Sequence, residues 1–138
     1  MLRNQLIAAR FVLTLGHLVS LFMVLFSMDR HIYAGFPEQP TGPEMSQARK
    51  NLKAAVTLAG CCFFFDLSGI FYHSLFMNQV NCIQIFLHFM GGVLVSVFIY
   101  QSWNYLYMWP LVMLFNIPSL FIEISVLFAY YVLKIVVL

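Results

Sequence analysis

Residues 11–28 read FVLTLGHLVSLFMVLFSM, an 18-residue apolar run interrupted only by small and weakly polar residues and by His17. A bilayer core of about 30 Å needs about 20 helical residues, each rising about 1.5 Å. The run is therefore predicted to be a membrane-spanning helix. Its apolar region exceeds the roughly 7–15 residues of a secretory signal peptide, so a retained signal anchor is expected rather than a cleaved one.

The composition of the whole chain supports this interpretation. The sequence is 62% hydrophobic and 9% charged, whereas about 25% of the residues in a globular domain are charged. With a mean hydropathy of +0.88, the chain is predicted to be a polytopic membrane protein. The net charge of +2 and the scattered lysines and arginines give no basis for a nucleic-acid partner.

Four apolar segments are long enough to cross a bilayer, at about residues 6–28, 54–72, 82–100 and 109–133. Residues 29–53 form the main connection outside the membrane, and the other connections are short. Short connections make consecutive helices antiparallel. No internal repeat divides the chain. The sequence thus predicts an all-α fold, a single domain of residues 1–138 forming an antiparallel four-transmembrane-helix bundle.

The second helix is predicted to begin before its apolar segment. Thr41 and Glu44 have the spacing of a capping box, and Pro43 suits the first helical turn. The helix is therefore expected to start near Pro43, outside the membrane, and to continue without a break into Ala54.

Two sequence features predict details of helix shape and packing. Pro118 lies inside the fourth apolar segment and cannot donate a backbone hydrogen bond to Leu114, so a kink is predicted there. Ser119 or a neighbouring helix is expected to satisfy the freed carbonyl. The small-residue spacings Ala55-x-x-x-Ala59 and Gly92-x-x-x-Ser96 allow helices to approach closely, and they indicate packing rather than a site.

Each predicted span carries one ionisable side chain well inside it: His17, Asp66, His88 and Glu123. The helical rise places all four in the half of the membrane nearer to the chain termini. Because a charged group at mid-bilayer is unfavourable by about 2.5–3.5 kcal/mol on insertion scales, such residues normally face the bundle interior. Two acid–imidazole pairs are therefore expected to form a shared polar cluster.

Structural and chemical interpretations of this cluster remain open. The favoured one is a hydrogen-bonded layer that determines which helix faces which. The alternatives are contact with a ligand or lipid headgroup, and transition-metal or proton chemistry. No His-x-x-x-His, Glu-x-x-His or Cys-x-x-Cys spacing supports a metal, and no catalytic or cofactor-binding residue is assigned.

The orientation in the membrane is only weakly determined by charge. Arg3, Arg10 and Lys134 lie on the side of the termini, and the main connection carries Arg30, Arg49, Lys50 and Lys53. The two N-terminal arginines flank the first helix, which usually dominates orientation, and this favours cytosolic termini.

Short motifs along the chain resemble one family, the transmembrane protein 107 family of small four-span proteins of the ciliary transition zone. The motifs are RFVLTLGHLV at Arg10–Val19, Asp29, Pro37, Asp66-Leu67-Ser68-Gly69, Phe76-Met77-Asn78, His88, Phe98-Ile99-Tyr100 with Trp103, and Pro118 with Glu123. They occur in the family's order and at matching separations over nearly the whole chain.

The resemblance implies a non-enzymatic membrane scaffold without cofactors. Proteins of this family belong to the Meckel syndrome module at the base of the cilium, where they help to control ciliary membrane composition and ciliogenesis. The implied partners are membrane lipids and transition-zone proteins of the tectonic, B9-domain and multispan types. Two other functions remain open on the residues alone: a small membrane transporter or enzyme that uses the His/Asp/Glu cluster, and a lipid- or sterol-organising tetraspan.

Overall fold

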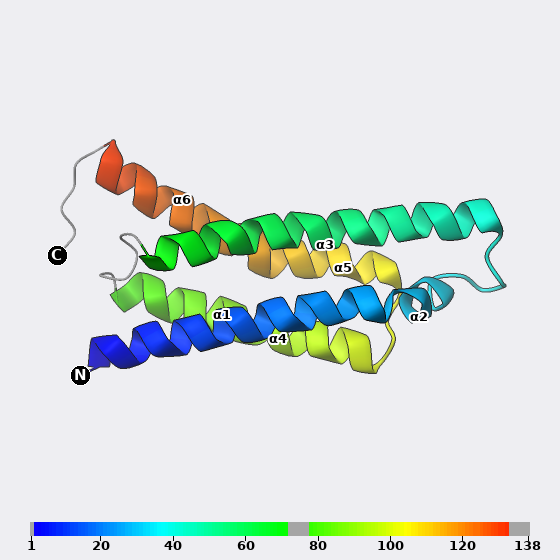
Figure 1. The fold of residues 1–138 in the computed structure, drawn as a ribbon, viewed down its shortest axis with the longest axis horizontal. Coiled ribbons are helices and arrows are strands. Elements are labelled where there is room, and N and C mark those ends of the chain that lie inside the picture. Colours follow the sequence, from blue (N-terminus) through cyan, green and yellow to red (C-terminus); the bar gives the residue numbers. More distant parts are fainter. Residues whose placement is uncertain (1, 72–77, 133–138) are drawn as a thin grey trace.

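The computed structural model describes residues 2–71 and 78–132, which fold into a bundle of long helices (Figure 1). The four longest are α1 (Leu2–Phe26), α3 (Gly42–Phe71), α4 (Asn78–Tyr100) and α6 (Ile117–Tyr131). The shorter segments are α2 (Met28–Tyr33), the 3-10 helix η2 (Tyr105–Tyr107), α5 (Met108–Leu111) and the π-helix η3 (Val112–Asn116).

Within the described residues, four helical stretches are long and apolar enough to cross a membrane. They are Asn4–Phe26, Gly42–Ile70, Asn78–Tyr100 and Tyr105–Tyr131. The predicted all-α, four-helix membrane fold is confirmed. The second stretch is longer than the predicted segment 54–72, because α3 begins in the polar connection and continues straight into the apolar sequence.

The most extensive contact in the bundle joins two helices that run in the same direction. The beginnings of α1 and α4 lie at the same end of the bundle as the ends of α3 and α6 (Figure 1). α1 packs most extensively on α4, and α3 packs on α6. Consecutive spans are antiparallel, as predicted, but α3 and α4 lie across the bundle from each other. The short connection predicted after the second span falls mainly on residues 72–77, outside the described part of the chain.

Small residues let α1 and α4 approach closely. A Cβ atom placed on Gly92 would lie 3.4 Å from the Cα of His17. One turn further along, the hydroxyl oxygens of Ser20 and Ser96 are 3.3 Å apart. The Gly92-x-x-x-Ser96 spacing therefore lies at the contact between these two helices, as expected for small residues in membrane bundles.

The beginning of α3 has the predicted capping interaction. The backbone N–H of Thr41 donates to the Glu44 carboxylate over 2.8 Å, and the Thr41 hydroxyl donates to the same oxygen over 2.7 Å. α3 begins at Gly42. The prediction that this helix starts near Pro43 and runs unbroken past Ala54 is confirmed.

The surroundings of Pro118 are also distorted. The π-helical segment η3 ends two residues before Pro118, and the ribbon changes direction between α5 and α6 (Figure 1). A π-turn shifts the hydrogen-bonding register, which accommodates the N–H that proline lacks. The Ser119 hydroxyl donates to Gln84 Oε1 on α4.

Apolar side chains fill the half of the bundle nearer to residues 27–53, and we call this region the apolar half. Its buried residues are Leu21, Val24, Met28, Ile32, Ala48, Leu52, Ala55, Val56, Ala59, Phe63, Val95, Phe98, Met108, Leu111 and Val112. All the long helices except α6 contribute to it, and the Ala55–Ala59 pair lies within it.

His31 of α2 closes the apolar half at its outer end. Its buried ring stacks on Phe98, with ring centroids 4.1 Å apart. Nδ1 lies 2.9 Å from the Trp103 carbonyl and therefore donates, which leaves Nε2 to accept from the Ser27 hydroxyl at 3.0 Å. Burial lowers the pKa of His31, so this neutral form is favoured in the fold.

Candidate functional site

The buried faces of the helices repeat at alternating spacings of three and four residues. On α4 the buried residues are Asn81, Gln84, His88, Gly91, Val95 and Phe98, together with Val80 beside the first of them. This spacing keeps one face of a helix directed at its neighbours. The first three positions are polar and the later ones are small or apolar, so the same inward face changes character halfway across the membrane.

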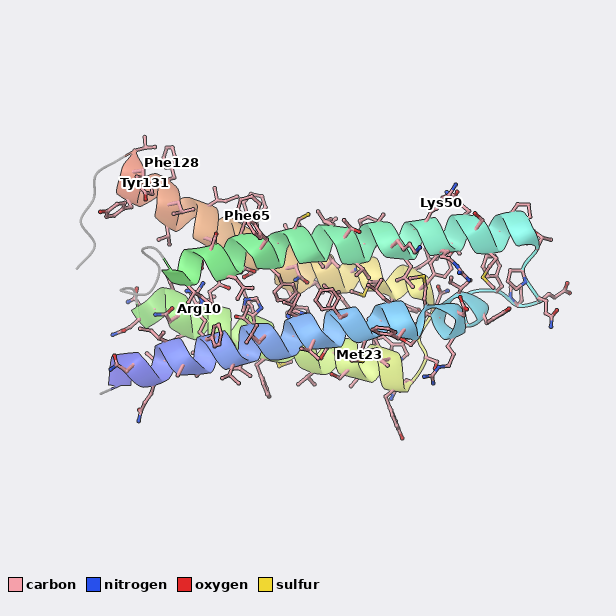
Figure 2. The ribbon with its side chains drawn as sticks, viewed as in Figure 1. Arg10, Met23, Lys50, Phe65, Phe128 and Tyr131 are labelled. Atoms are coloured by element: carbon pink, nitrogen blue, oxygen red, sulfur yellow. The ribbon has the colours of Figure 1, made fainter. Side chains whose placement is uncertain are left out.

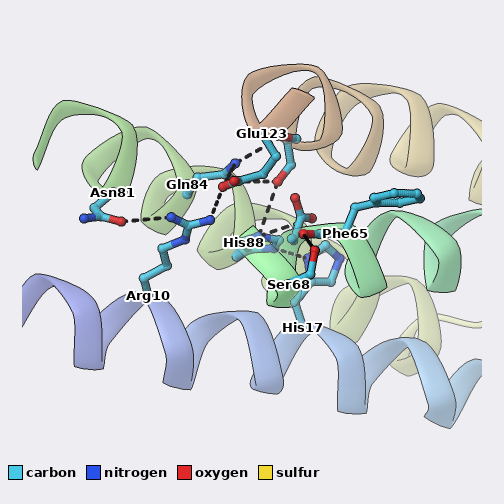
Figure 3. Close-up of polar contacts among 10 residues, drawn as sticks. Arg10, His17, Phe65, Ser68, Asn81, Gln84, His88 and Glu123 are labelled. Atoms are coloured by element: carbon cyan, nitrogen blue, oxygen red, sulfur yellow. Dashed lines mark hydrogen bonds and ion pairs between the residues drawn. The ribbon is translucent and has the colours of Figure 1, made fainter. Parts of the chain in front are cut away.

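Nine of the twelve buried polar side chains of the described residues meet in the half of the bundle nearer to the chain termini, which we call the polar half (Figure 3); the others are Ser27, His31 and Asn116. Its members are Arg10, Thr14, His17, Asp66, Asn81, Gln84, His88, Ser119 and Glu123. All four predicted residues, one from each span, are buried there, and His17 is 2% exposed rather than facing lipid.

An ion pair between α1 and α6 is the strongest interaction in the polar half. Arg10 is 0% exposed, and its Nη2 donates to the Glu123 carboxylate. Its Nη1 donates to Asn81 Oδ1 on α4 over 2.9 Å. One guanidinium thus connects three helices, and its charge is balanced inside the bundle, as buried charges require.

Gln84 and Ser119 connect this ion pair to the histidines. The Gln84 amide donates to Glu123 Oε1 over 3.2 Å and to the Ser119 carbonyl over 3.1 Å. The Ser119 hydroxyl donates to Gln84 Oε1 and lies 3.4 Å from Nε2 of His88. Every span except α3 takes part in this continuous network.

The two histidines bring α3 into the polar half. His88 Nδ1 lies 3.4 Å from His17 Nδ1, and His88 Nε2 lies 3.7 Å from Asp66 Oδ2. Phe63 packs against both imidazoles, with ring centroids 4.8 Å from His17 and 5.4 Å from His88. His88 is therefore the central residue between α1, α3 and α6.

Two glycines make room for the charged and aromatic groups. A Cβ atom on Gly69 would overlap the Glu123 carboxylate, and a Cβ atom on Gly91 would overlap the His17 ring. Gly69 belongs to the Asp66-Leu67-Ser68-Gly69 motif. The motif thus places an acid and a close-contact position one turn apart on α3.

The expected pairing of the four ionisable residues is only partly found. Asp66 faces His88, but Glu123 is paired with Arg10 and not with an imidazole. Arg10, which was assigned to the membrane surface, belongs to the interior. The physical reason is that a fully charged guanidinium neutralises a carboxylate more effectively than an imidazole, which is mostly neutral at pH 7.

The sequence-based cluster also omitted Asn81, Gln84 and Ser119. Their signal was present in the spacing: Asn81, Gln84 and His88 recur at three and four residues, as do Arg10, Thr14 and His17. Neutral amides and hydroxyls are harder than charged groups to recognise as members of a buried polar cluster, although they too need hydrogen-bond partners in lipid.

The polar half offers hydrogen bonds and one internally balanced ion pair. In the described residues, no group of three or more His, Cys, Asp or Glu side chains is arranged to hold a metal ion. The contacts join all four spans at one depth, and they fix the lateral and rotational positions of the helices. These interactions are those of helix–helix recognition.

These features define a class: a polytopic α-helical membrane protein whose helices are joined by a buried ion-paired layer. The TMEM107 family model, described as a transmembrane protein, matches residues 6–127. The chain belongs to the TMEM107 family. Comparisons with curated proteins and with solved structures gave no match.

Proposed function

We propose that this protein is a non-enzymatic membrane scaffold of the ciliary transition zone, which helps to assemble the gate that controls ciliary membrane composition and ciliogenesis. The observation that carries the proposal is the family match over residues 6–127, together with the resemblance to transition-zone proteins in the ordered motifs.

The distribution of side chains is compatible with a scaffold. Outside the four spans, the described chain has only α2 and short connections, so most of its surface faces lipid. Large aromatic side chains such as Phe64, Phe121 and Phe128 are exposed on the helices, and Figure 2 shows Phe65 and Phe128 directed away from the bundle. Contacts within the plane of the membrane are the main ones such a molecule can make.

The proposed partners are membrane lipids and proteins of the Meckel syndrome module, of the tectonic, B9-domain and multispan types. The orientation with cytosolic termini remains a prediction from the sequence. Arg10, one of the charges on which this orientation was predicted, is buried in the bundle. The orientation should therefore be tested by protease protection of tags placed at each terminus and in residues 34–41.

Localisation in a ciliated cell tests the proposal directly. We expect the fluorescently tagged full-length protein to form a narrow band at the base of the cilium, and its removal to change the protein composition of the ciliary membrane. A tagged endoplasmic-reticulum membrane protein of similar size is the matched control. Diffuse endomembrane staining, equal to that of the control, would contradict the proposal.

A transporter or membrane enzyme is the alternative function, and the contiguous His17, His88 and Asp66 side chains are the observation in its favour. The two functions differ in their response to Asp66→Asn. A scaffold keeps its localisation and shows no flux in reconstituted vesicles, whereas a transporter loses a measurable flux while its assembly is preserved.

A further inference from the structure

A second polar feature lies at the opposite end of the bundle, where α1 ends beside α3. A groove of about 220 Å³ is formed there by the apolar residues Leu25, Phe26 and Met28 and by the charged residues Asp29, Arg49 and Lys53. None of these residues belongs to the polar half. One wall of the groove is apolar and the other is charged.

The groove lies at the boundary between hydrocarbon and headgroups. Phe26 is the last residue of the first span and is 85% exposed. Lys53 directly precedes the apolar stretch that begins at Ala54. The apolar wall is thus placed beside acyl chains, and the charged wall is placed at headgroup depth.

The charged wall has an excess of positive charge. Arg49 and Lys53 are one helical turn apart, so they lie on the same face of α3. Arg49 Nη2 donates to Asp29 Oδ1 over 2.7 Å, and a guanidinium has five N–H donors. Two basic residues, Arg49 and Lys53, thus line the groove together with one acid, Asp29. The acid Glu44 lies further from the membrane and is bonded to Thr41.

We propose that this groove binds the headgroup of an anionic phospholipid. Arg49 and Lys53 contact the phosphate, and Leu25 and Phe26 contact the upper part of the acyl chain. Charge complementarity selects the anionic lipid, because the positive choline group of a zwitterionic lipid gains nothing from a basic wall. The inference depends neither on the ciliary location nor on the orientation of the chain, so it can fail while the proposed function stands.

Native mass spectrometry of the full-length protein tests this binding. The protein is released from vesicles that contain phosphatidylserine and phosphatidylcholine in equal amounts, and the bound lipids are counted. We expect a several-fold excess of bound phosphatidylserine for the wild type. The double variant Arg49→Gln/Lys53→Gln should lose this excess, while Asp29→Asn should increase it.

Lys50→Gln is the matched control, because it removes one positive charge from the same helix but from a side chain that points away from α1 (Figure 2). It should retain the excess of phosphatidylserine. Soluble glycerophosphoserine should not displace the bound lipid, since it lacks the acyl chain that the apolar wall contacts.

Equal binding of the two lipids to the wild type would overturn the proposal. A loss in Lys50→Gln as large as that in Lys53→Gln would also overturn it, because it would indicate diffuse attraction to the basic surface. If the double variant does not fold, as judged by circular dichroism and gel filtration, the single variant Lys53→Gln decides.

Discussion

The polar half and the apolar half of this bundle share α1, α3 and α4 and the same three-and-four spacing, yet they are held together differently. In the apolar half, side chains such as Leu21 and Phe98 exchange contacts with lipid for contacts with each other. Lipid chains are as apolar as leucine, so this exchange yields only a gain in packing. In the polar half, groups such as Arg10, Gln84 and Glu123 exchange an unfavourable exposure to hydrocarbon for a hydrogen bond or an ion pair.

Because of this difference, the polar half should determine the arrangement of the helices. Apolar faces are nearly interchangeable in lipid, whereas Arg10 has few positions in which its charge is balanced. We therefore expect the largest effects of substitution in the polar half, smaller ones where the helices merely pack, and the smallest at the outer end.

Breaking the ion pair should have the largest effect. In Glu123→Gln the Arg10 charge stays buried without a counter-charge, and we expect the free energy of unfolding to fall by about 3–5 kcal/mol. This free energy can be measured by unfolding the protein in mixed micelles of increasing dodecyl sulfate content. The double variant Arg10→Met/Glu123→Leu should recover most of the loss, because it removes both charges.

The exposed pair of Arg49 and Asp29 is the internal control for this measurement. Arg49→Gln should change the free energy of unfolding by about 0–1 kcal/mol, as exposed ion pairs do. If Glu123→Gln were no more destabilising than Arg49→Gln, the polar half would not be the main source of specificity.

A methyl group at the contact between α1 and α4 should have the next largest effect. In Gly91→Ala the new Cβ meets the His17 ring, and overpacking of this kind destabilises a protein by about 1–3 kcal/mol. Gly60→Ala is the matched control, because nothing lies within 4 Å of its added Cβ. It should be neutral or stabilising by up to about 1 kcal/mol, from helix propensity. Equal effects of the two substitutions on unfolding would disprove the close contact.

A truncation in the apolar half should be milder than in a soluble protein. Leu21 is 1% exposed and lies inside the first span, so Leu21→Ala leaves a cavity but loses no transfer from water. We expect the free energy of unfolding to fall by about 2 kcal/mol or less, at the low end of the range for leucine in soluble cores. Phe64→Ala, on the lipid-facing surface, should have almost no effect. A larger loss for Leu21→Ala than for Glu123→Gln would reverse the comparison between the two halves.

Acidification should have the smallest effect on the free energy of unfolding, and this effect should come from the protonation of His31. Its pKa is lowered in the folded state, so the unfolded state binds more protons once the pH falls below the ordinary histidine pKa of about 6.5. Stability is fully present above that pH and decreases as the pH falls towards the lowered value. His31→Phe keeps the stacking on Phe98 and should remove this part of the pH dependence. An unchanged pH profile in that variant would show that His31 is not responsible.

The fold could be predicted from the sequence because a membrane-spanning helix is recognised by its length and apolarity alone. Helical rise also places His17, Asp66, His88 and Glu123 at a similar depth, and the structure buries all four in one region. Both predictions depend on local geometry along a single helix.

The partners across the bundle could not be predicted in the same way. Whether α3 lies beside α4 or across from it depends on contacts between segments distant in sequence, and the chain's apolar faces do not distinguish the two. The position of Arg10 could not be predicted for a related reason. An arginine near a helix end is normally a surface charge, and Arg10 is buried because it pairs with Glu123 on α6.

Glu123, the partner of Arg10, is translated long after it. Arg10 and Glu123 are 113 residues apart, so the arginine leaves the ribosome while the acid has still to be translated. Until α6 enters the membrane, the long Arg10 side chain can reach the interface and act as an orienting charge for the first helix. The ion pair can therefore form only after α6 has been made, and a chain that ends before α6 lacks the counter-charge of Glu123.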